Sequence, residues 1–365
     1  MPGKFEFKKF SAIDIGDPFF DELKADYPGT ATSTGFEAWF AKKAEANDTA
    51  LIFDDDDGIG AFIALKDEDE ELELATETLP AVPRLKISTL RLAPKHRGQR
   101  LGEGALGLIL WQWKRRKQQE VYVTVFEKHD LLIGLFEHFG FKMVGKNPNG
   151  ELVYLRSRVD VDYSDPYKAF PFINPAFQKA GYVLVEDYYH DTLFPYSELK
   201  GELQKQVGLS VANGISKIYV GKQFTPPHYQ VGEPVLIYRK YNGTGTKRYK
   251  SCITSYCIVT DIILVKTRGQ FNMAFEDLLA RIGNKSVFDE RDLLAKYQND
   301  NNVVVIEMLY YGYFGEGNNV NMDWLDKHSY WAGGNEYPTE VQLSSDEFKQ
   351  ILTEGNVNVS DVIIN

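Results

Sequence analysis

One short stretch of the chain, residues 96–106 with the sequence HRGQRLGEGAL, combines the residue types that hold a phosphate group. It follows an apolar run at 85–92, which predicts a strand, and it opens a run at 101–118 with helical spacing. The first N–H groups of a helix have no intrahelical acceptor, and the helix dipole favours an anion there. Glycine and arginine in such a turn therefore predict an anion site.

Three polar residues follow the next predicted strand, Val121–Phe126, and they could move protons. Glu127, His129 and Asp130 lie directly after it, near the end of the predicted sheet. A carboxylate or an imidazole in a cleft can take a proton from an attacking group or give one to a leaving group. We treat these three as candidate catalytic residues, with an exposed loop carboxylate as the alternative for Glu127.

No pattern of metal ligands stands out, and we expect no metal. The acidic turn Asp54–Gly58 lacks the spaced ligands of a calcium loop, so a solvated hairpin tip is the preferred interpretation. Cys252 and Cys257 lie in one predicted strand without histidine or aspartate partners, which favours neither a zinc site nor a disulfide framework. We expect both to be core residues of a reduced, cytoplasmic protein.

Composition limits the classes of function. The 365 residues suffice for two domains, and 43% hydrophobic content supports real cores. The net charge of −11 argues against broad nucleic-acid binding, which normally needs a basic face. No apolar run reaches the roughly 18–20 residues of a membrane span, and the first residues lack the apolar core of a signal peptide. We therefore expect no membrane partner.

Periodicity gives the elements that must position these residues. The first half is expected to contain strands at 4–10, 50–53, 59–65, 85–92, 121–126, 140–144 and 152–155. Its helices are expected at 17–47, with a break near Pro28 and Gly29, and at 101–118 and 129–139. The second half is expected to contain strands at 215–220, 231–239, 251–265 and 303–310, and helices at 197–207, 271–282 and 289–297. We predict domains at 1–158 and 176–365, joined by a polar linker at 159–175.

The phosphate-binding stretch resembles the acyl-CoA pyrophosphate loop of the GNAT acetyltransferases, whose pattern is Gln/Arg-x-x-Gly-x-Gly/Ala. Arg97, Arg100 and Gly102 stand at the three pattern positions, with arginine where the middle glycine is usual. The segment Leu135–Phe141, with the sequence LFEHFGF, is similar to the later family motif Leu-Tyr-Glu-Lys-x-Gly-Phe. The resemblance covers residues 1–158 and implies a GNAT fold, a mixed twisted sheet with helices.

The resemblance also implies a cofactor, acetyl-CoA or another acyl-CoA. Its pantetheine arm would lie in a wedge between the strand ending near Leu92 and the strand Val121–Val125. Main-chain groups of Leu90, Arg91 and Leu92 would bind this arm, and His129 falls where the family often has an asparagine facing it. The residues implied for the pyrophosphate are Arg97, Gly98, Gln99, Arg100, Leu101 and Gly102.

One position departs from the family pattern. Many GNAT enzymes use a tyrosine to protonate the departing thiolate, and this chain has Phe136 at the matching position. Coenzyme A thiolate, with a thiol pKa of about 8.5, can leave without a dedicated acid. A water molecule or His129 could also supply the proton.

The second half resembles the PUA-like barrels, the superfamily that includes the ASCH modules. The strands Gly232–Arg239 and Tyr256–Val259 carry the resemblance, with Glu233 and Cys257 replacing the usual aspartate and glycine. It implies a PUA-like β-barrel with helical additions that binds RNA or modified nucleobases. Tyr238, Arg239 and Tyr256 are the candidate contacts; the alternative is that the aromatic rings fill a core.

Three functions follow as hypotheses. The first is an acyl-CoA-dependent N-acyltransferase that transfers an acetyl group to an amine, with a second domain that selects a substrate such as tRNA. The second is a GNAT-type toxin or regulator that acylates an essential cellular molecule. The third is a non-catalytic acyl-CoA sensor, which Phe136 keeps open.

Overall fold

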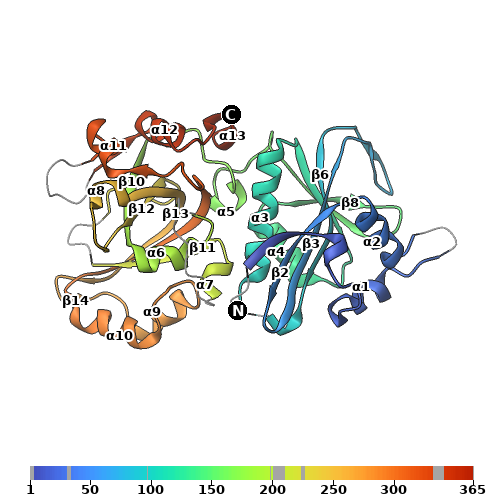
Figure 1. Cartoon of the computed structure of the whole chain (residues 1–365), viewed down its shortest axis with the longest axis horizontal. Helices are drawn as coiled ribbons and strands as arrows, with labels where there is room; N and C mark the ends of the chain where they lie inside the picture. The colour runs from blue at the N-terminus through green and yellow to red at the C-terminus, as the bar shows by residue number, and fades with distance from the viewer. Residues whose placement is uncertain are drawn as a thin grey trace.

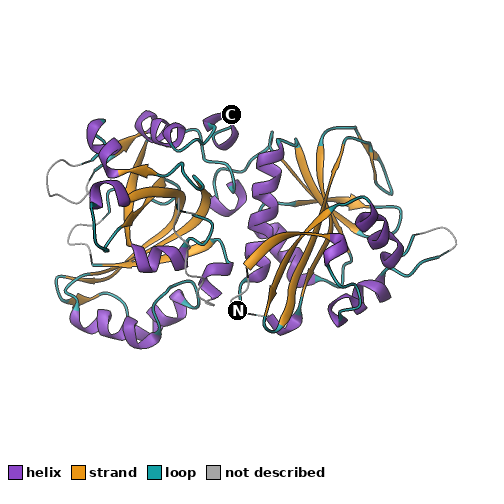
Figure 2. Cartoon of the chain, viewed as in Figure 1, coloured by secondary structure: helices purple, strands orange, loops and turns teal. Residues whose placement is uncertain are grey.

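The computed structural model describes residues 4–30, 34–96, 98–197, 199, 210–222, 227–331 and 341–364. Figure 1 shows two halves side by side, each built on a β-sheet with helices against it. We call residues 4–158 the N-terminal half, residues 159–175 the connecting segment, and residues 176–364 the C-terminal half. Both classes of secondary structure occur in each half (Figure 2), which agrees with the expected α/β character.

The N-terminal half contains a 7-stranded sheet with the order β1-β2-β3-β6-β7-β9-β8. Its strands are β1 (Lys4–Lys9), β2 (Thr49–Asp55), β3 (Gly58–Glu68), β6 (Arg84–Leu92), β7 (Glu120–Val125), β8 (Lys142–Lys146) and β9 (Leu152–Ser157). Only β6 and β7 run parallel, and the other neighbours are antiparallel. A separate two-stranded ribbon pairs β4 (Leu72–Glu73) with β5 (Thr78–Leu79).

Helices cover both faces of this sheet because its strands are apolar on both sides. Ala50 and Ile52 of β2 face a small aromatic core, whereas Leu51 and Phe53 face the main core. The elements on the small core are η1 (Phe10–Ala12), η2 (Pro18–Phe20), α1 (Asp21–Asp26) and α2 (Phe36–Glu45). Those on the main core are α3 (Leu101–Arg116) and α4 (Asp130–His138), and η3 (Pro94–His96) precedes α3. These bounds match the predicted elements of this half to within a few residues.

The C-terminal half contains an 8-stranded sheet with the order β11-β15-β13-β12-β10-β17, with β14 and β16 beside β13. The strands are β10 (Lys179–Glu186), β11 (Ser216–Gly221), β12 (Pro234–Lys240), β13 (Cys252–Thr267), β14 (Gln270–Phe271), β15 (Val303–Tyr313), β16 (Val320–Asn321) and β17 (Leu343–Ser344). The helices are α6 (Asp187–Leu193), α7 (Ser210–Asn213), α8 (Lys247–Lys250), α9 (Phe275–Ile282), α10 (Glu290–Asn299), α11 (Met322–Lys327), α12 (Ser345–Glu354) and α13 (Val359–Val362). The helix predicted at 197–207 lies almost entirely outside the described residues.

The expected barrel is not found, since no sheet of the described residues closes on itself. The outer edge of β11 bonds to other groups instead of a closing strand. The Ile218 N–H donates to the Lys285 carbonyl at 3.0 Å, and the Ser216 N–H donates to Glu103 of α3. The N-terminal half therefore occupies part of the edge that a barrel would use for its last strand.

The second part of the connecting segment belongs to the folded interior. It contains α5 (Pro166–Ala169), and Phe170, Phe172 and Ile173 are fully buried in a core cluster that includes residues of both halves. Trp111 Nε1 of α3 donates to the Tyr311 carbonyl of β15 at 2.9 Å. The two halves thus share one apolar core along α3, which lies at their junction in Figure 1.

Within the described part of the chain, none of the helices has both the length and the apolar character needed to cross a bilayer.

Candidate functional site

The two parallel strands of the N-terminal sheet separate towards their carboxyl ends. β6 and β7 pair only from Arg84 with Glu120 to Ile87 with Val123. β6 nevertheless continues to Leu92, bonded on its other side to β3 as far as Ala61. In the described residues the β7-facing edge of β6 therefore has no strand partner beyond Ile87. The wedge implied by the resemblance is present, and Leu90, Arg91 and Leu92 lie along its open edge.

The predicted phosphate loop forms a tight turn from η3 into α3. Gly98 has φ +78° and Arg100 has φ +60°, both in the left-handed region, and α3 begins at Leu101. The first helical hydrogen bond is donated by Gly104 N to the Arg100 carbonyl at 3.1 Å. The N–H groups of the residues before Gly104 in the first turn have no intrahelical acceptor, so they can receive an anion. Arg97 lies outside the described residues.

Gly102 lies at the closest approach between this turn and the wedge. A Cβ atom at Gly102 would stand 3.1 Å from Leu92 Cδ1 and 3.3 Å from Leu135 Cδ2. Leu92 ends β6 and Leu135 belongs to α4, so the turn, the wedge and the second motif meet at this point. A large side chain at Gly102 would fill the space next to the open N–H groups.

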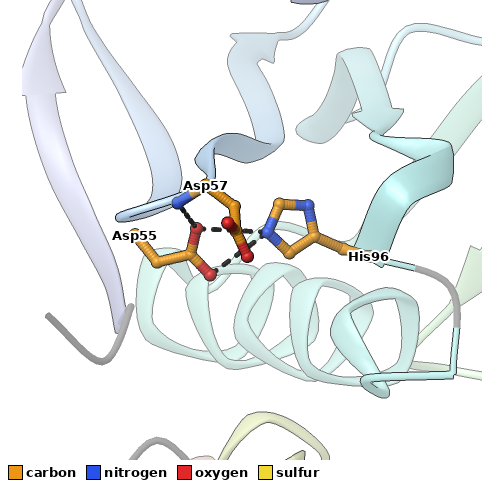
Figure 3. Close-up of side chains that lie close together, drawn as sticks. All are labelled: Asp55, Asp57 and His96. Carbon is orange, nitrogen blue, oxygen red and sulfur yellow. Dashed lines mark hydrogen bonds and ion pairs between the residues drawn. The ribbon is translucent and has the colours of Figure 1, made fainter.

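A polar cluster anchors the other side of the turn, at the tip of the β2–β3 hairpin (Figure 3). His96 Nε2 lies 3.1 Å and 3.3 Å from the two carboxylate oxygens of Asp55, and Lys95 Nζ donates to the Asp57 carbonyl. One ligand atom each from Asp55, Asp57 and His96 fall within 4.8 Å of one another, so this group has the donors to hold a cation. Its observed contacts join the hairpin tip to the turn before the phosphate loop.

The three candidate catalytic residues lie together after β7, on the exposed side. The Glu127 side chain is 80% exposed and stands 3.6 Å from Lys146 Nζ. His129 is the half-buried N-cap residue of α4 and its side chain makes no capping bond, while Asp130 is exposed. Their roles in chemistry stay predictions.

Phe136 packs in the main core and has no exposed surface. Its ring centroid lies 5.3 Å from that of Phe141, and its place on α4 faces the interior. The next residue, Glu137, accepts a hydrogen bond of 2.9 Å from the Tyr154 hydroxyl. The position that carries a tyrosine in the family therefore offers no proton donor here.

Residues 19–27 bridge the mouth of the wedge, which the sequence did not indicate. On the β6 side, Arg91 Nε donates to the Phe19 carbonyl at 2.6 Å. On the β7 side, Lys128 Nζ lies 2.8 Å from Asp26, and the Tyr27 ring lies 5.8 Å from that of Phe126. The bridge therefore contacts β6 and the residues directly after β7, beyond the point where the two strands separate.

A buried carboxylate meets this bridge. Glu151, in the turn before β9, is 7% exposed and accepts hydrogen bonds from the Tyr27 hydroxyl at 3.2 Å and from Asn147 Nδ2 at 2.8 Å. Burial, and then the charge of Glu151, raise the pKa of Tyr27. The two residues are 124 positions apart, and neither belongs to a recognisable motif, so only the tertiary structure joins them.

The candidate nucleic-acid contacts of the C-terminal half are interior residues. Tyr238 and Tyr256 are each 2% exposed. The Tyr238 ring packs 4.6 Å from that of Trp331, and the Tyr256 hydroxyl lies 3.3 Å from Lys114 Nζ of α3. Arg239 is 5% exposed and forms a two-point ion pair with Asp191 at 2.9 and 3.0 Å. Core packing therefore describes these side chains, and neither ring has an open face for a base.

Residues 16–141 match the family model described as acetyltransferase (GNAT) family. This match, together with the strand order and the parallel β6–β7 pair, confirms the predicted resemblance for this part of the chain. Residues 16–141 are thus a GNAT acetyltransferase domain, followed by a separate sheet-rich region. The resemblance of that region to PUA-like and ASCH-like modules stays a prediction.

Several solved structures are similar to part of the chain. A GNAT family acetyltransferase from Elizabethkingia anophelis with acetyl-CoA bound is 12% identical, with a TM-score of 0.30, covering 43% of this chain and 98% of that one. Arabidopsis thaliana Naa50 in complex with a bisubstrate analogue is 17% identical, with a TM-score of 0.29 and coverage of 43% and 99%. The ribosomal-protein-S18-alanine N-acetyltransferase from Escherichia coli is 12% identical, with a TM-score of 0.27 and coverage of 42% and 91%. No curated protein sequence matches the chain.

Proposed function

We propose that the protein is an acyl-CoA-dependent N-acyltransferase that uses acetyl-CoA or another acyl-CoA as donor. The observation that carries this is the junction at Gly102, where the open N–H groups of α3 meet the wedge between β6 and β7. An anion site beside an unpaired strand edge suits a ligand with a pyrophosphate at one end and an amide-containing arm at the other. The family match of residues 16–141 supports the same reading.

The acceptor amine would enter at the bridged mouth of the wedge. Amine attack on a thioester requires the neutral amine, and the proton must pass to a base. We propose Glu151 as that base, acting directly or through the Tyr27 hydroxyl, because it is a buried carboxylate at the mouth. Phe136 donates no proton, so the thiolate leaves unassisted or takes its proton from water or His129.

Thiol release from acetyl-CoA and the effect of expression on cell growth separate this proposal from its alternatives. A toxin or regulator would also consume acetyl-CoA, and it would stop cell growth when expressed. A sensor would bind acetyl-CoA and release no thiol with any amine. A role of the C-terminal half in selecting RNA or a nucleobase stays a prediction that the covered Tyr238 and Tyr256 do not favour. The expected cytoplasmic location fits the buried thiols of Cys252 and Cys257, which are not joined in a disulfide.

The first test is thermal stabilisation by the donor. We expect 1 mM acetyl-CoA to raise the Tm of the protein by about 2 to 5 °C if the Kd is about 10 µM, since ligand at 100 times its Kd contributes about 2.7 kcal/mol. Gly102→Trp should abolish the rise, because the indole would occupy the space beside Leu92 and Leu135. Differential scanning fluorimetry measures both.

The matched control is Gly134→Trp on α4, where nothing lies within 4 Å of an added Cβ. This variant should keep the rise in Tm. Circular dichroism of Gly102→Trp checks that it is folded. A wild-type protein whose Tm does not move with millimolar acetyl-CoA would contradict the proposed donor.

A further inference from the structure

Three consecutive residues of the phosphate loop are held by the C-terminal half. The Gly98 carbonyl accepts a hydrogen bond from Asn284 Nδ2, in the turn after α9. The Gln99 carbonyl accepts one of 3.0 Å from Asn213 Nδ2, at the end of α7. Arg100 Nη2 donates to the Ser216 carbonyl at 2.5 Å. These partners lie more than 100 residues from the loop along the chain.

The arginine at the unusual position serves this junction. The Arg100 side chain is 8% exposed, and Nη2 lies 2.9 Å from Glu103, whose carboxylate also accepts the Ser216 N–H. Glu103 thus neutralises a buried guanidinium, and the Ser216 carbonyl and hydroxyl of β11 accept further hydrogen bonds from Nη2. The Arg100 guanidinium is thus held between Glu103 of α3 and Ser216 of β11.

The carbonyl contacts fix the direction of the loop N–H groups. In a trans peptide the C=O and the following N–H point in opposite directions. Asn213 holds the Gln99 carbonyl towards the C-terminal half, so the Arg100 N–H must point away from it. The preceding peptide is held at both ends, since Asn284 binds the Gly98 carbonyl and the Gln99 N–H donates to the His96 carbonyl at 3.2 Å. His96 is in turn paired with Asp55, as Figure 3 shows.

Two glycines of α3 keep these partners in place. A Cβ at Gly104 would stand 1.9 Å from the Asn213 carbonyl oxygen, and one at Gly107 would stand 2.5 Å from Ile215 Cγ2. The chain from Asn213 to Ser216 therefore lies directly on the helix that follows the loop. Its position is set by backbone packing as well as by side-chain hydrogen bonds.

We propose that the C-terminal half sets the conformation of the acyl-CoA phosphate loop, with Asn213 and Asn284 as positioning residues. This inference rests on the proposed function, since it concerns the same cofactor site. The loop contains two left-handed residues and would sample many conformations if it were free. Because Asn213 and Asn284 hold the carbonyls of the loop before acyl-CoA binds, the loop loses less conformational entropy on binding. Affinity for acyl-CoA therefore depends on how the two halves are docked.

The test compares four asparagine variants by isothermal titration calorimetry with acetyl-CoA. We expect Asn213→Ala and Asn284→Ala each to weaken binding about fivefold, which corresponds to about 1 kcal/mol, and the double variant to weaken it further. The control is Asn318→Ala, whose side chain also donates to a backbone carbonyl of the C-terminal half, that of Phe314 at 3.0 Å. The control should bind as the wild-type protein does.

The Tm without ligand distinguishes positioning from unfolding, and it should stay within about 2 °C of the wild-type value for Asn284→Ala because Asn284 is exposed. If Asn213→Ala fails to fold, the affinity of Asn284→Ala for acetyl-CoA is the test of the positioning role. If the wild-type protein binds acetyl-CoA and the affinity of Asn284→Ala is within 1.5-fold of it, the positioning role is overturned and the proposed function stands. Absence of wild-type binding would overturn both.

Discussion

Glu151 and Tyr27 form a polar pair at the bridged mouth of the wedge. Burial of a carboxylate is costly unless hydrogen bonds satisfy it, and the Glu151 carboxylate accepts one from the Tyr27 hydroxyl and one from Asn147 Nδ2. Such a residue at the mouth of a wedge is better placed to meet a neutral amine than the exposed Glu127. The two carboxylates therefore compete for the role of base, and substitution separates them.

We expect Glu151→Gln to lower kcat/KM for acyl transfer by about 100-fold, since positioned general bases contribute roughly 10²–10⁴. Glutamine keeps the size and can still accept the Tyr27 hydrogen bond, so the Kd for acetyl-CoA should not change. The rate is measured as thiol release in the presence of an acceptor amine. That amine is first identified by mass spectrometry of acylated products. Glu127→Gln should retain most of the activity; a larger loss in Glu127→Gln than in Glu151→Gln would return the role to the residue predicted from sequence.

At the scale of elements, α3 packs against both halves of the molecule, with a different face on each. One face, predicted from the spacing of Leu101, Ala105 and Leu108, packs on the N-terminal sheet. The other carries residues spaced by three or four, and they contact the C-terminal half: Arg100, Gly104, Gly107, Trp111 and Lys114. Two glycines inside a helix cost stability, so their presence here indicates a close backbone approach.

Two helical glycines should respond in opposite ways to the same substitution. Gly104→Ala should lower the free energy of unfolding by about 1 to 3 kcal/mol, because its Cβ would overlap the Asn213 carbonyl. Gly134→Ala should raise it by about 0.5 to 1 kcal/mol, because alanine favours the helix and nothing lies nearby. Chemical denaturation of both variants measures the difference. Stabilisation by Gly104→Ala would mean that α7 does not press on α3.

The sequence predicted the N-terminal elements well because each has a local signal. Alternating strands, a glycine-rich turn and a helical run require no knowledge of distant residues, and their order matched a family. The bridge from Phe19 to Tyr27 and its bond to Glu151 have no such signal. The second face of α3 has no local signal either, because only the tertiary structure shows that Gly104 and Gly107 pack against Asn213 and Ile215.

In the C-terminal half, local signals predicted strands but not how the strands pair. The strands at 231–239 and 251–265 were found, yet the closure of a barrel depends on which edges pair. Here the outer edge of β11 bonds to Lys285 and to Glu103 of the other half. Tyr238 and Tyr256 have the residue type of a stacking surface, and only the packing of Trp331 and α3 shows that they are covered.

For the molecule as a whole, the junction of the halves contains a lysine in an apolar setting. Lys114 Nζ lies 3.3 Å from both the Tyr256 hydroxyl and the Tyr311 carbonyl, and burial of the ammonium lowers its pKa to about 7. The unfolded chain keeps the ordinary value of about 10.4. Between these values the unfolded state binds more protons than the folded one, so the stability contributed by this group rises with pH from 7 to about 10.

Lys114→Met should remove this dependence. We expect the variant to have a Tm on the order of 2–5 °C above wild type at pH 6, where the ammonium is charged in both states. The difference should shrink as the pH rises towards 10. Lys42→Met, at an exposed position on α2, is the control and should shift Tm equally little at every pH. A difference between Lys114→Met and wild type that is constant from pH 6 to 10 would refute the pH dependence assigned to Lys114.

The packing of α13 on α3 has a consequence for the order of events during synthesis. Asp361 pairs with Lys117 at 3.0 Å, and the Ile173 N–H donates to the Val362 carbonyl at 2.7 Å. These residues leave the ribosome about 240 positions after α3, which at roughly 5–20 residues per second is about 10 to 50 s later. During that interval the C-terminal end of α3 lacks its contact with α13, and chaperones that bind exposed apolar helices have time to engage the nascent chain.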